Sequence, residues 1–325
     1  MYVPNDYQRT TAKTKNILLY DGSSVWGDLS TEAIFNKCPV SQCAATYEVK
    51  EANTSDAIIF TMYSVKNEHV RPSKQLWILY LLECPSYTPS FKSLANLINW
   101  TATYRSDSDI VAPYAKWVYY DDQVKEKLQK ENYAANKSMK VAWFVSNCNT
   151  KNNRLKYAQE LSKYVPVDIY GSCGNLFCLK SDPKCFELLK TYKFYLSFEN
   201  SNCRDYITEK LYQNALRQDI VPIVMGAPKE NYVKSVPRDS FIHVDDYESP
   251  KELANYLYTL HKNDNLYNKF FKWKGTGEFI NTYFWCRLCT LLHSPFPTKF
   301  YKDVNEWWGR PGICTYKEWK NVSIV

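Results

Sequence analysis

The sequence has no apolar run of membrane-spanning length, no signal peptide, no low-complexity tract and no internal repeat. These absences leave an ordinary globular chain, and 325 residues are enough for two domains. The net charge of +7 comes from Lys and Arg residues that are scattered along the chain rather than clustered. We therefore do not expect a nucleic-acid-binding surface.

The spacing of a zinc module is also missing, although the chain has eleven cysteines. The close pairs Cys38/Cys43 and Cys286/Cys289 lack the accompanying His and Cys ligands, and the second pair lacks the helix pattern of a thioredoxin. So many cysteines are typical of an oxidising compartment. Four N-glycosylation sequons favour the same secretory route, and they begin at Asn53, Asn99, Asn136 and Asn321.

Apolar runs alternate with amphipathic segments along most of the chain. Between residues 140 and 265 this alternation predicts a parallel, doubly wound α/β sheet. The charged, lysine-rich segment 121–138 predicts a linker or an exposed helix. Helices are expected at 91–99, 153–164 and 249–261, the last opened by a capping box with proline at its first position. Strands are expected at 15–20, 57–63, 75–82, 141–145, 167–170, 192–198, 220–225 and 241–244.

The segment FYLSFENSNCRDYITEKL (194–211) predicts a strand, a polar turn and a helix start. A helix N-terminus favours anions, because its backbone N–H groups and its dipole point to one place. Lys210 in the first turn is unfavourable for the helix dipole unless a negative ligand lies nearby. The alternative is an ordinary strand–helix unit with a solvated lysine.

This segment and several others resemble the α1,3-fucosyltransferases of glycosyltransferase family 10. The resemblance implies a GT-B fold, with two Rossmann-like α/β domains facing across a cleft. We expect an acceptor-side domain at 1–138, a donor-binding domain at 139–290 and a tail at 291–325 that packs back on the first domain. The other similar segments are WFVSNCNTKNNRLKYAQELSKYVPVDIYGSCG (143–174), IVPIVMGAPKENY (220–232), FKWKGTGEFINTYFWCRLC (271–289) and EWWGRPGIC (306–314).

The resemblance implies GDP-fucose as the donor substrate, and protein cations rather than a metal would compensate the charge of its diphosphate. An Asp-x-Asp string, Asp107-Ser-Asp109, is present, but it lies in a segment similar to the acceptor-side domain, so no metal site is assigned. Stimulation by a divalent metal is left open, and no cofactor is required. The residues expected to bind the donor are Arg154, Lys210, Asn200, Tyr206, Glu209, Ser146 and Asn147.

Glu83 is the expected catalytic base. It directly follows the apolar run QLWILYLL, in a Leu-Glu-x-Pro context similar to that of the family's base. Fucose is β-linked in the donor and α-linked in the product of this family, so an inverting reaction needs one carboxylate to take the acceptor's proton. Cys84 stands where several vertebrate relatives have Ser, and of the eleven cysteines we expect it to be outside any disulfide.

The resemblance further implies that Cys286 and Cys289 bond back to Cys38 and Cys43. The other six cysteines would form three disulfides whose pairing the sequence does not give; they are Cys148, Cys173, Cys178, Cys185, Cys203 and Cys314. Members of the family are type II Golgi proteins, so we expect a Golgi-luminal enzyme whose membrane anchor has been removed, or a secreted form.

The motifs look most like the core enzymes of invertebrates, which fucosylate O3 of the asparagine-linked GlcNAc of N-glycans. The alternatives are a Lewis-type enzyme acting on antennal GlcNAc and a glycan-binding protein on an inactive transferase scaffold. The expected partner is an N-glycan or glycoprotein acceptor. Candidates for the acceptor side are Trp100, Tyr104, Asp107, Asp109, Tyr114, Trp307 and Trp308.

Overall fold

The computed structural model describes residues 3–4, 7–8, 11–27, 29, 33–63, 71–178, 182–295 and 299–315. The chain forms two compact units, Met1–Pro113 with Thr282–Ile313 and Tyr114–Asn281 with Cys314–Val325. The first boundary thus falls about two dozen residues before the one expected from the sequence. The reason is that β7 (Lys116–Tyr119) pairs with β14 (Gly277–Ile280), which ties the segment after residue 113 to the second unit.

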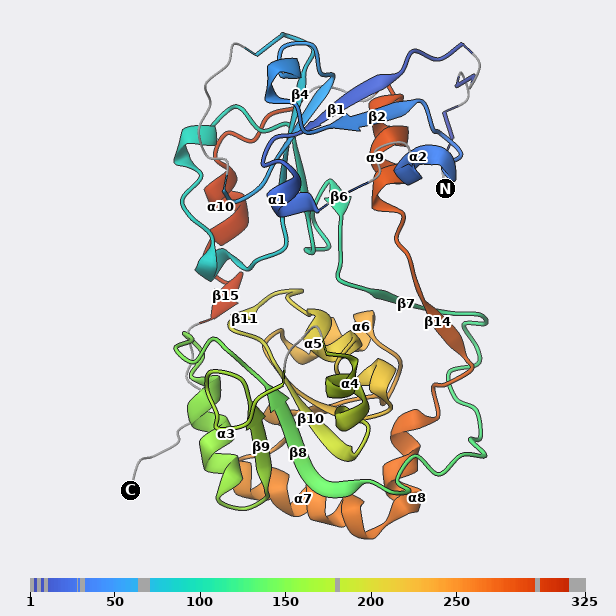
Figure 1. Ribbon diagram of the computed structural model, residues 1–325, viewed down its shortest axis with the longest axis vertical. Helices are drawn as coiled ribbons and strands as arrows, with labels where there is room; N and C mark the ends of the chain where they lie inside the picture. The colour runs from blue at the N-terminus through green and yellow to red at the C-terminus, as the bar shows by residue number, and fades with distance from the viewer. Residues whose placement is uncertain are drawn as a thin grey trace. The chain divides into compact units, whose positions relative to one another are not determined.

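The first unit is built on a six-stranded parallel sheet of order β2-β1-β3-β4-β5-β6 (Figure 1). Its central strands carry almost only apolar side chains, as expected of a parallel sheet that is buried on both faces. The strands are β1 (Lys15–Leu19), β2 (Cys43–Thr46), β3 (Ala57–Phe60), β4 (Leu76–Leu81), β5 (Trp100–Thr103) and β6 (Ile110–Val111). The helices and helical turns are α1 (Ser23–Trp26), α2 (Ala33–Asn36), η1 (Val49–Glu51), η2 (Pro85–Tyr87), η3 (Lys92–Leu94), α9 (Phe284–Leu292) and α10 (Val304–Gly309).

The predicted helix at 91–99 is wrong. Only the single turn η3 forms there, and Asn96 takes a left-handed backbone conformation with φ +57° before the chain enters β5. Segment 121–138 forms no helix before β8 begins at Ser138. It forms turns near both of its ends, and between them the backbone of Lys127 donates to the carbonyl of Lys272 at 2.7 Å. A partner distant in sequence therefore binds the middle of this segment, which a local pattern does not reveal.

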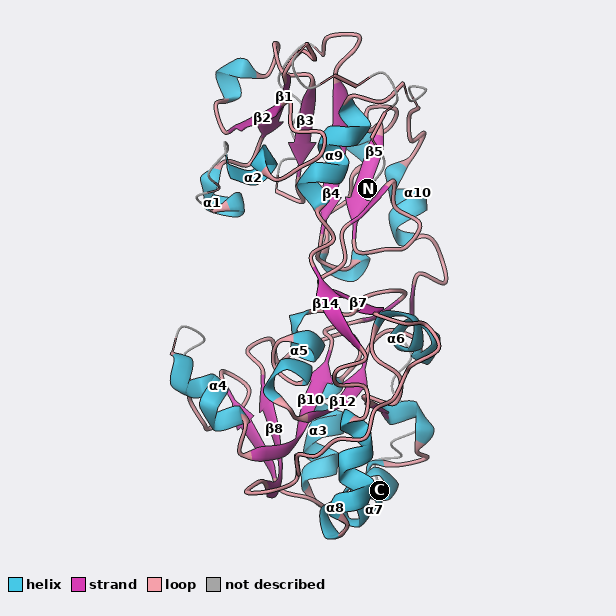
Figure 2. Cartoon of the chain, turned by 90° about the vertical axis from the view of Figure 1, so that its right-hand side faces the viewer, coloured by secondary structure: helices cyan, strands magenta, loops and turns pink. Residues whose placement is uncertain are grey.

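The second unit is built on a five-stranded parallel sheet of order β13-β12-β10-β8-β9. Helices α4 and α5 lie on one face of this sheet, and α3 and α7 on the other (Figure 2). The sheet strands are β8 (Ser138–Phe144), β9 (Val167–Tyr170), β10 (Tyr192–Phe198), β12 (Val221–Met225) and β13 (Ile242–His243), and the ribbon β11 (Asn202–Cys203) with β15 (Cys314–Thr315) is separate. The helices and helical turns are α3 (Arg154–Ser162), α4 (Pro183–Leu189), α5 (Glu209–Tyr212), η4 (Leu216–Gln218), α6 (Lys229–Ser235), η5 (Val244–Asp246), α7 (Pro250–Lys262), α8 (Asp264–Asn268) and η6 (Lys269–Phe271).

Of the capping box predicted at the start of α7, the serine half forms, whereas the glutamate bonds to the residue before the N-cap instead of to the N-cap itself. The Ser249 side chain accepts a hydrogen bond from the backbone of Glu252, and the Glu252 carboxylate accepts one from the backbone of Glu248. Leu253, Leu257 and other apolar residues of this helix then pack on the sheet in the largest core cluster. In the part of the chain that the structure describes, no helix is both long and apolar enough to cross a membrane.

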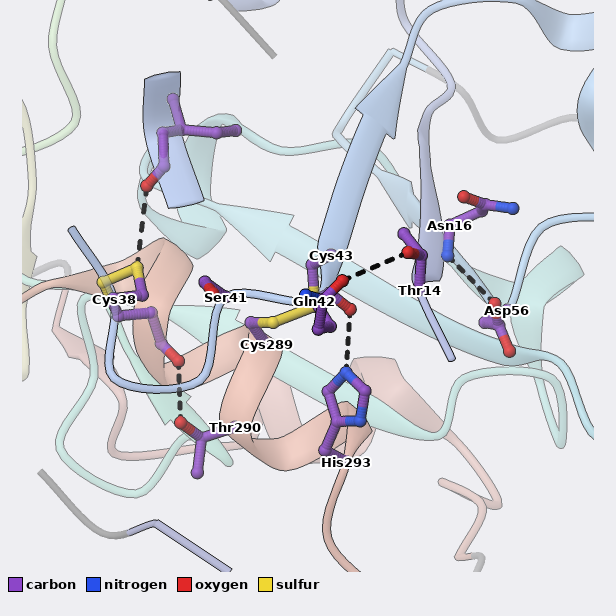
Figure 3. The surroundings of a disulfide bond; sticks show 12 residues. Thr14, Asn16, Cys38, Ser41, Gln42, Cys43, Asp56, Cys289, Thr290 and His293 are labelled. Atoms are coloured by element: carbon purple, nitrogen blue, oxygen red, sulfur yellow. Dashed lines mark hydrogen bonds between the residues drawn. A yellow bond between two sulfur atoms is a disulfide. The ribbon is translucent and has the colours of Figure 1, made fainter. Parts of the chain in front are cut away.

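Two disulfides attach α9 to β2 and to the segment that precedes this strand. Cys38 bonds to Cys286, and Cys43, the first residue of β2, bonds to Cys289 (Figure 3). Nε2–H of His293, at the end of α9, donates to the carbonyl of Gln42 at 2.8 Å beside the second bond. Three further disulfides join Cys148–Cys173, Cys178–Cys185 and Cys203–Cys314, and Cys84 is a buried thiol.

The sequons differ in accessibility. Asn53 and Asn136 are exposed, whereas the side chain of Asn99 is fully buried. Its amide accepts hydrogen bonds from Arg71 and from the backbone of Trp77, and it donates to the carbonyl of Lys299 at 2.8 Å. The folded unit therefore has no room for a glycan at Asn99, which corrects the expectation from the sequence. Asn321 lies outside the described residues.

We expect intact-glycopeptide mass spectrometry of the protein from a glycosylating host to find glycans at Asn53 and Asn136 and none at Asn99. The reason is that a glycan at Asn99 would break three buried hydrogen bonds. The variant Asn99→Gln should keep the same glycan content while losing thermal stability. A glycan on Asn99 in the folded, secreted protein would contradict this assignment.

Candidate active site

The polar residues of the second unit gather after the carboxyl ends of β8 and β10, two adjacent strands of its sheet. In a parallel doubly wound sheet this edge is where ligands bind. The loop after β8 carries Ser146 and Asn147, which are exposed, and the loop after β10 carries Asn200, which is half-buried. The positions thus agree with a ligand site at this edge of the second unit.

Lys210 is the second residue of α5, which has only four residues. A helix of one turn has a weak dipole, so the expected attraction of an anion to this helix start is smaller than the sequence pattern indicated. The ammonium group donates instead to Glu199 Oε2 at 2.9 Å and to Thr208 Oγ1 at 2.8 Å, and it lies 3.5 Å from Glu209 Oε1. A carboxylate of the protein therefore supplies the negative charge that the sequence assigned to a ligand.

Glu199 was not predicted from the sequence. It directly follows β10, whose seven residues are all buried, and its own side chain is only 1% exposed. The signal that could have identified it is a glutamate placed immediately after so apolar a strand. Its carboxylate accepts hydrogen bonds from the backbone of Thr208 at 2.8 Å and from the Thr208 hydroxyl at 3.0 Å, besides that from Lys210.

Lys210 and Glu199 each favour the charged form of the other. Burial alone would lower the pKa of Lys210, but the negative charges of Glu199 and Glu209 outweigh it, so its pKa lies above the ordinary value. Burial raises the pKa of Glu199, and Lys210 and the Thr208 backbone oppose that effect. With three donors on one carboxylate, we assign the pair as ionised at neutral pH.

Arg154 begins α3, as predicted, but it is not a surface residue: only 4% of it is exposed. Its guanidinium donates to the carbonyl of Phe198 at 2.6 Å and to that of Asn147 at 3.0 Å. It therefore ties the end of β10 to the loop after β8. Asn152 does the same from the preceding turn, since its amide donates to the carbonyl of Glu199 at 2.9 Å.

The loop between β10 and α5 is fixed at several points. Cys203 pairs with Cys314, and Asp205 takes a left-handed conformation with φ +61° while its backbone donates to Asn231 Oδ1 at 3.0 Å. Tyr206 is buried, whereas the Glu209 side chain is 39% exposed. Five of the residues expected to bind a donor are at least partly accessible on one unit: Ser146, Asn147, Asn200, Glu209 and Lys210. Arg154 and Tyr206 are buried.

Glu83 belongs to the first unit. It lies two residues after β4 and is half-buried, and its Oε1 accepts a hydrogen bond from the backbone of Cys84 at 2.8 Å. Cys84 itself is buried, and Pro85 then begins the turn η2. The carboxylate thus stands at the carboxyl end of a central parallel strand, the position where such sheets present functional groups.

The acidic pair of the Asp-x-Asp string has structural partners. Asp107 pairs with the fully buried Arg105 at 2.6 Å, and Arg105 also donates to the carbonyl of Trp307. Asp109 accepts from the backbone of Thr101 at 2.8 Å and from the Tyr301 hydroxyl at 2.9 Å. These contacts favour a role in fixing the loop over metal binding.

Among the aromatic candidates, Trp100, Tyr104 and Trp308 are buried. Trp307 is half-buried and stacks on Trp308, with Arg105 over its ring at 4.2 Å, and Tyr114 is also half-buried but lies in the second unit. Within the described residues, the one grouping of possible metal ligands is Cys43, Cys289 and His293, and its two sulfur atoms form a disulfide.

Two family models match the chain. The model for "Glycosyltransferase family 10 (fucosyltransferase) C-term" matches residues 134–307, and that for "Fucosyltransferase, N-terminal" matches residues 12–115. The chain is 53% identical to glycoprotein 3-alpha-L-fucosyltransferase A of Drosophila melanogaster over 99% of its own length and 66% of that protein. It is 37% identical to 4-galactosyl-N-acetylglucosaminide 3-alpha-L-fucosyltransferase 9 of Homo sapiens, over 86% of this chain and 77% of that one. The chain thus spans just under two thirds of the fly protein.

Solved structures show the same fold. A crystal structure of an α1,3-fucosyltransferase with GDP matches with a TM-score of 0.61 at 18% identity, covering 90% of this chain and 94% of that one. A second, with GDP-fucose, matches with a TM-score of 0.60 at 17% identity, covering 93% and 96%. The two parallel α/β units therefore have the expected GT-B type of fold.

Proposed function

Since the chain belongs to glycosyltransferase family 10, the fucosyltransferases, we propose that it transfers L-fucose from GDP-β-L-fucose to O3 of the asparagine-linked GlcNAc of N-glycans. The observation that carries this proposal is the 53% identity to the fly glycoprotein 3-alpha-L-fucosyltransferase over 99% of the chain. A related fold crystallised with GDP-fucose supports the choice of donor.

In the proposed reaction the O3 hydroxyl attacks C1 of fucose while the Glu83 carboxylate takes the hydroxyl proton. The C1–O bond to the β-phosphate breaks, and GDP leaves with the bonding electron pair. The attack inverts the anomeric centre from β to α, so a single base suffices and the nucleotide needs no acid. Glu83 is suited to this role because it is half-buried at the end of a rigid strand.

The negative charge that develops on GDP requires compensation by fixed cations or dipoles. Lys210 is a partly accessible cation at this strand edge, with a side chain that is 19% exposed, and its ammonium group is held in place by buried partners. We propose that Asn200 and Glu209 bind hydroxyl groups of the donor and that Arg154 and Tyr206 shape the loops from below. No metal is required in this scheme, and activity should persist in EDTA.

Five disulfides and two exposed sequons support an oxidising, glycosylating compartment, and we propose the Golgi lumen. A Lewis-type activity on antennal GlcNAc is the second candidate. It is favoured by the 37% identity to the human enzyme named for 4-galactosyl-N-acetylglucosaminide.

Mass spectrometry of a trimmed N-glycopeptide after incubation with GDP-fucose tests the proposal, with fragmentation to locate the added deoxyhexose. We expect fucose on the innermost GlcNAc, and the same result with EDTA present. Fucose on an antenna would instead support the Lewis-type activity. If fucose is added neither to the innermost GlcNAc nor to an antenna, both functions would be contradicted and a glycan-binding protein would be favoured.

A further inference from the structure

Glu199 is held in a site that the fold builds around it. Its backbone N–H donates to the carbonyl of Met225 at 2.8 Å, and its carbonyl accepts from Asn152 at 2.9 Å. Gly226, with φ +150°, lies against the side chain: a Cβ atom there would stand 2.8 Å from Cβ and Cγ of Glu199. Only glycine leaves this space without strain. The buried carboxylate is therefore a built feature of the strand end.

The ammonium group of Lys210 makes two hydrogen bonds of normal length and one longer contact. An ammonium group has three N–H donors. Two reach Glu199 and Thr208 at 2.9 and 2.8 Å, within the normal range, whereas the contact with Glu209 is 3.5 Å and therefore weak. The exposures are just as uneven, at 19% for the Lys210 side chain and 1% for that of Glu199. The glutamate faces the core, and the lysine is the member of the pair that a ligand can reach.

Thr208 completes the arrangement. It is the N-cap residue of α5, but its hydroxyl makes no capping bond to that helix. The hydroxyl donates to Glu199 Oε2 at 3.0 Å and accepts from Lys210 Nζ at 2.8 Å. The chain from lysine through threonine to glutamate closes a ring of three hydrogen bonds, because Lys210 also reaches Glu199 directly. Such a ring fixes the position of the ammonium nitrogen.

We propose that Glu199 is a positioning residue for donor binding: it holds one N–H group of Lys210 directly and a second through Thr208, and it leaves the third for a phosphate oxygen of the donor. This inference rests on the proposed function, because it takes a nucleoside diphosphate sugar as the ligand of Lys210. The three donors on the Glu199 carboxylate offset its negative charge, so it holds the lysine without repelling the diphosphate.

The test compares the wild-type protein with Glu199→Gln and with the double variant Glu199→Gln/Lys210→Met. Glutamine keeps the shape of the side chain but places an NH₂ group where one of the three donors needs an acceptor. We expect the dissociation constant of GDP to rise at least tenfold and kcat to fall at least tenfold, with KM for the acceptor unchanged. Adding Lys210→Met should then change the dissociation constant of GDP and kcat by less than a further twofold, because the lysine is already displaced.

Glu187→Gln is the matched control, because Glu187 pairs with Lys190 at 2.8 Å but both side chains are largely exposed. It should leave GDP affinity and kcat unchanged. Wild-type GDP affinity and kcat in Glu199→Gln, or a further tenfold loss in the double variant, would overturn the role of Glu199 while the wild-type enzyme remains active. A wild-type protein that neither binds GDP nor transfers fucose would overturn the proposed function as well. If Glu199→Gln does not fold, the double variant removes both charges, and GDP binding at wild-type strength by it would overturn the inference.

Discussion

Replacing Glu83 with glutamine is expected to reduce fucose transfer by about 10³-fold, the usual size of the contribution of a general base. The glutamine keeps the hydrogen bond that Oε1 accepts from the backbone of Cys84, so the loop after β4 should hold its conformation. The reaction loses only the group that takes the proton from the acceptor hydroxyl. Initial rates at saturating GDP-fucose and glycopeptide measure this loss.

Binding of GDP should remain at wild-type strength in the Glu83 variant, because Glu83 lies in the first unit and the proposed donor residues lie in the second. Isothermal titration with GDP checks this separation. Glu48→Gln is the matched control in the same unit, since the Glu48 side chain is 61% exposed. A Glu83→Gln protein with full activity would remove this residue from the mechanism.

Removing both disulfides that attach α9 should destabilise the first unit about three times as much as removing either one. Each bond closes nearly the same loop, with sequence separations of 248 and 246 residues. While one bond is present, the other closes only the short ring formed by residues 38–43 and 286–289. In the chain-entropy model that ring is worth about 2.5 kcal/mol, whereas loss of the last long-range bond costs about 5 kcal/mol.

The experiment compares three variants in which both cysteines of a pair become alanine: Cys38/Cys286, Cys43/Cys289, and all four. The free energy of unfolding is measured in urea by tryptophan fluorescence. The pair Cys178/Cys185, with a separation of 7 residues, is the control for loss of a disulfide with a short loop. Equal and additive losses from the two α9 bonds would contradict the shared-loop argument.

The sequence by itself determined the elements whose signal is local. The mostly apolar runs fixed the strands β3, β4, β10 and β12, because a strand buried on both faces is rich in apolar residues. The serine at 249 and the proline at 250 fixed the start of α7, because a serine cap and a proline at the first helical position act within one turn. The motifs of the resemblance also placed Lys210 and the acidic Glu83 at strand or helix ends.

Tertiary structure decided what depends on partners distant in sequence. The segment 91–99 has helical spacing, yet it feeds a strand whose neighbours are β4 and β6, and pairing with them outweighs a weak local preference. The residues after Asn99 make it a glycosylation sequon, but in the fold its buried amide is hydrogen-bonded to Arg71 and to the carbonyl of Lys299. No local pattern records such contacts.

The same holds for the site. Arg154 has the sequence context of a surface or ligand-binding arginine, but its guanidinium donates to a carbonyl at the end of β10 and to one in the loop after β8. Glu199 stands eleven residues before Lys210, and only the return of the chain after β10 brings their charges to 2.9 Å. The sequence thus indicated Lys210, Arg154 and Glu83 as charged groups of the proposed site, but it did not indicate Glu199. The fold decided which of them face the ligand and which hold the others, because a buried charge is stable only where the tertiary structure supplies its partner.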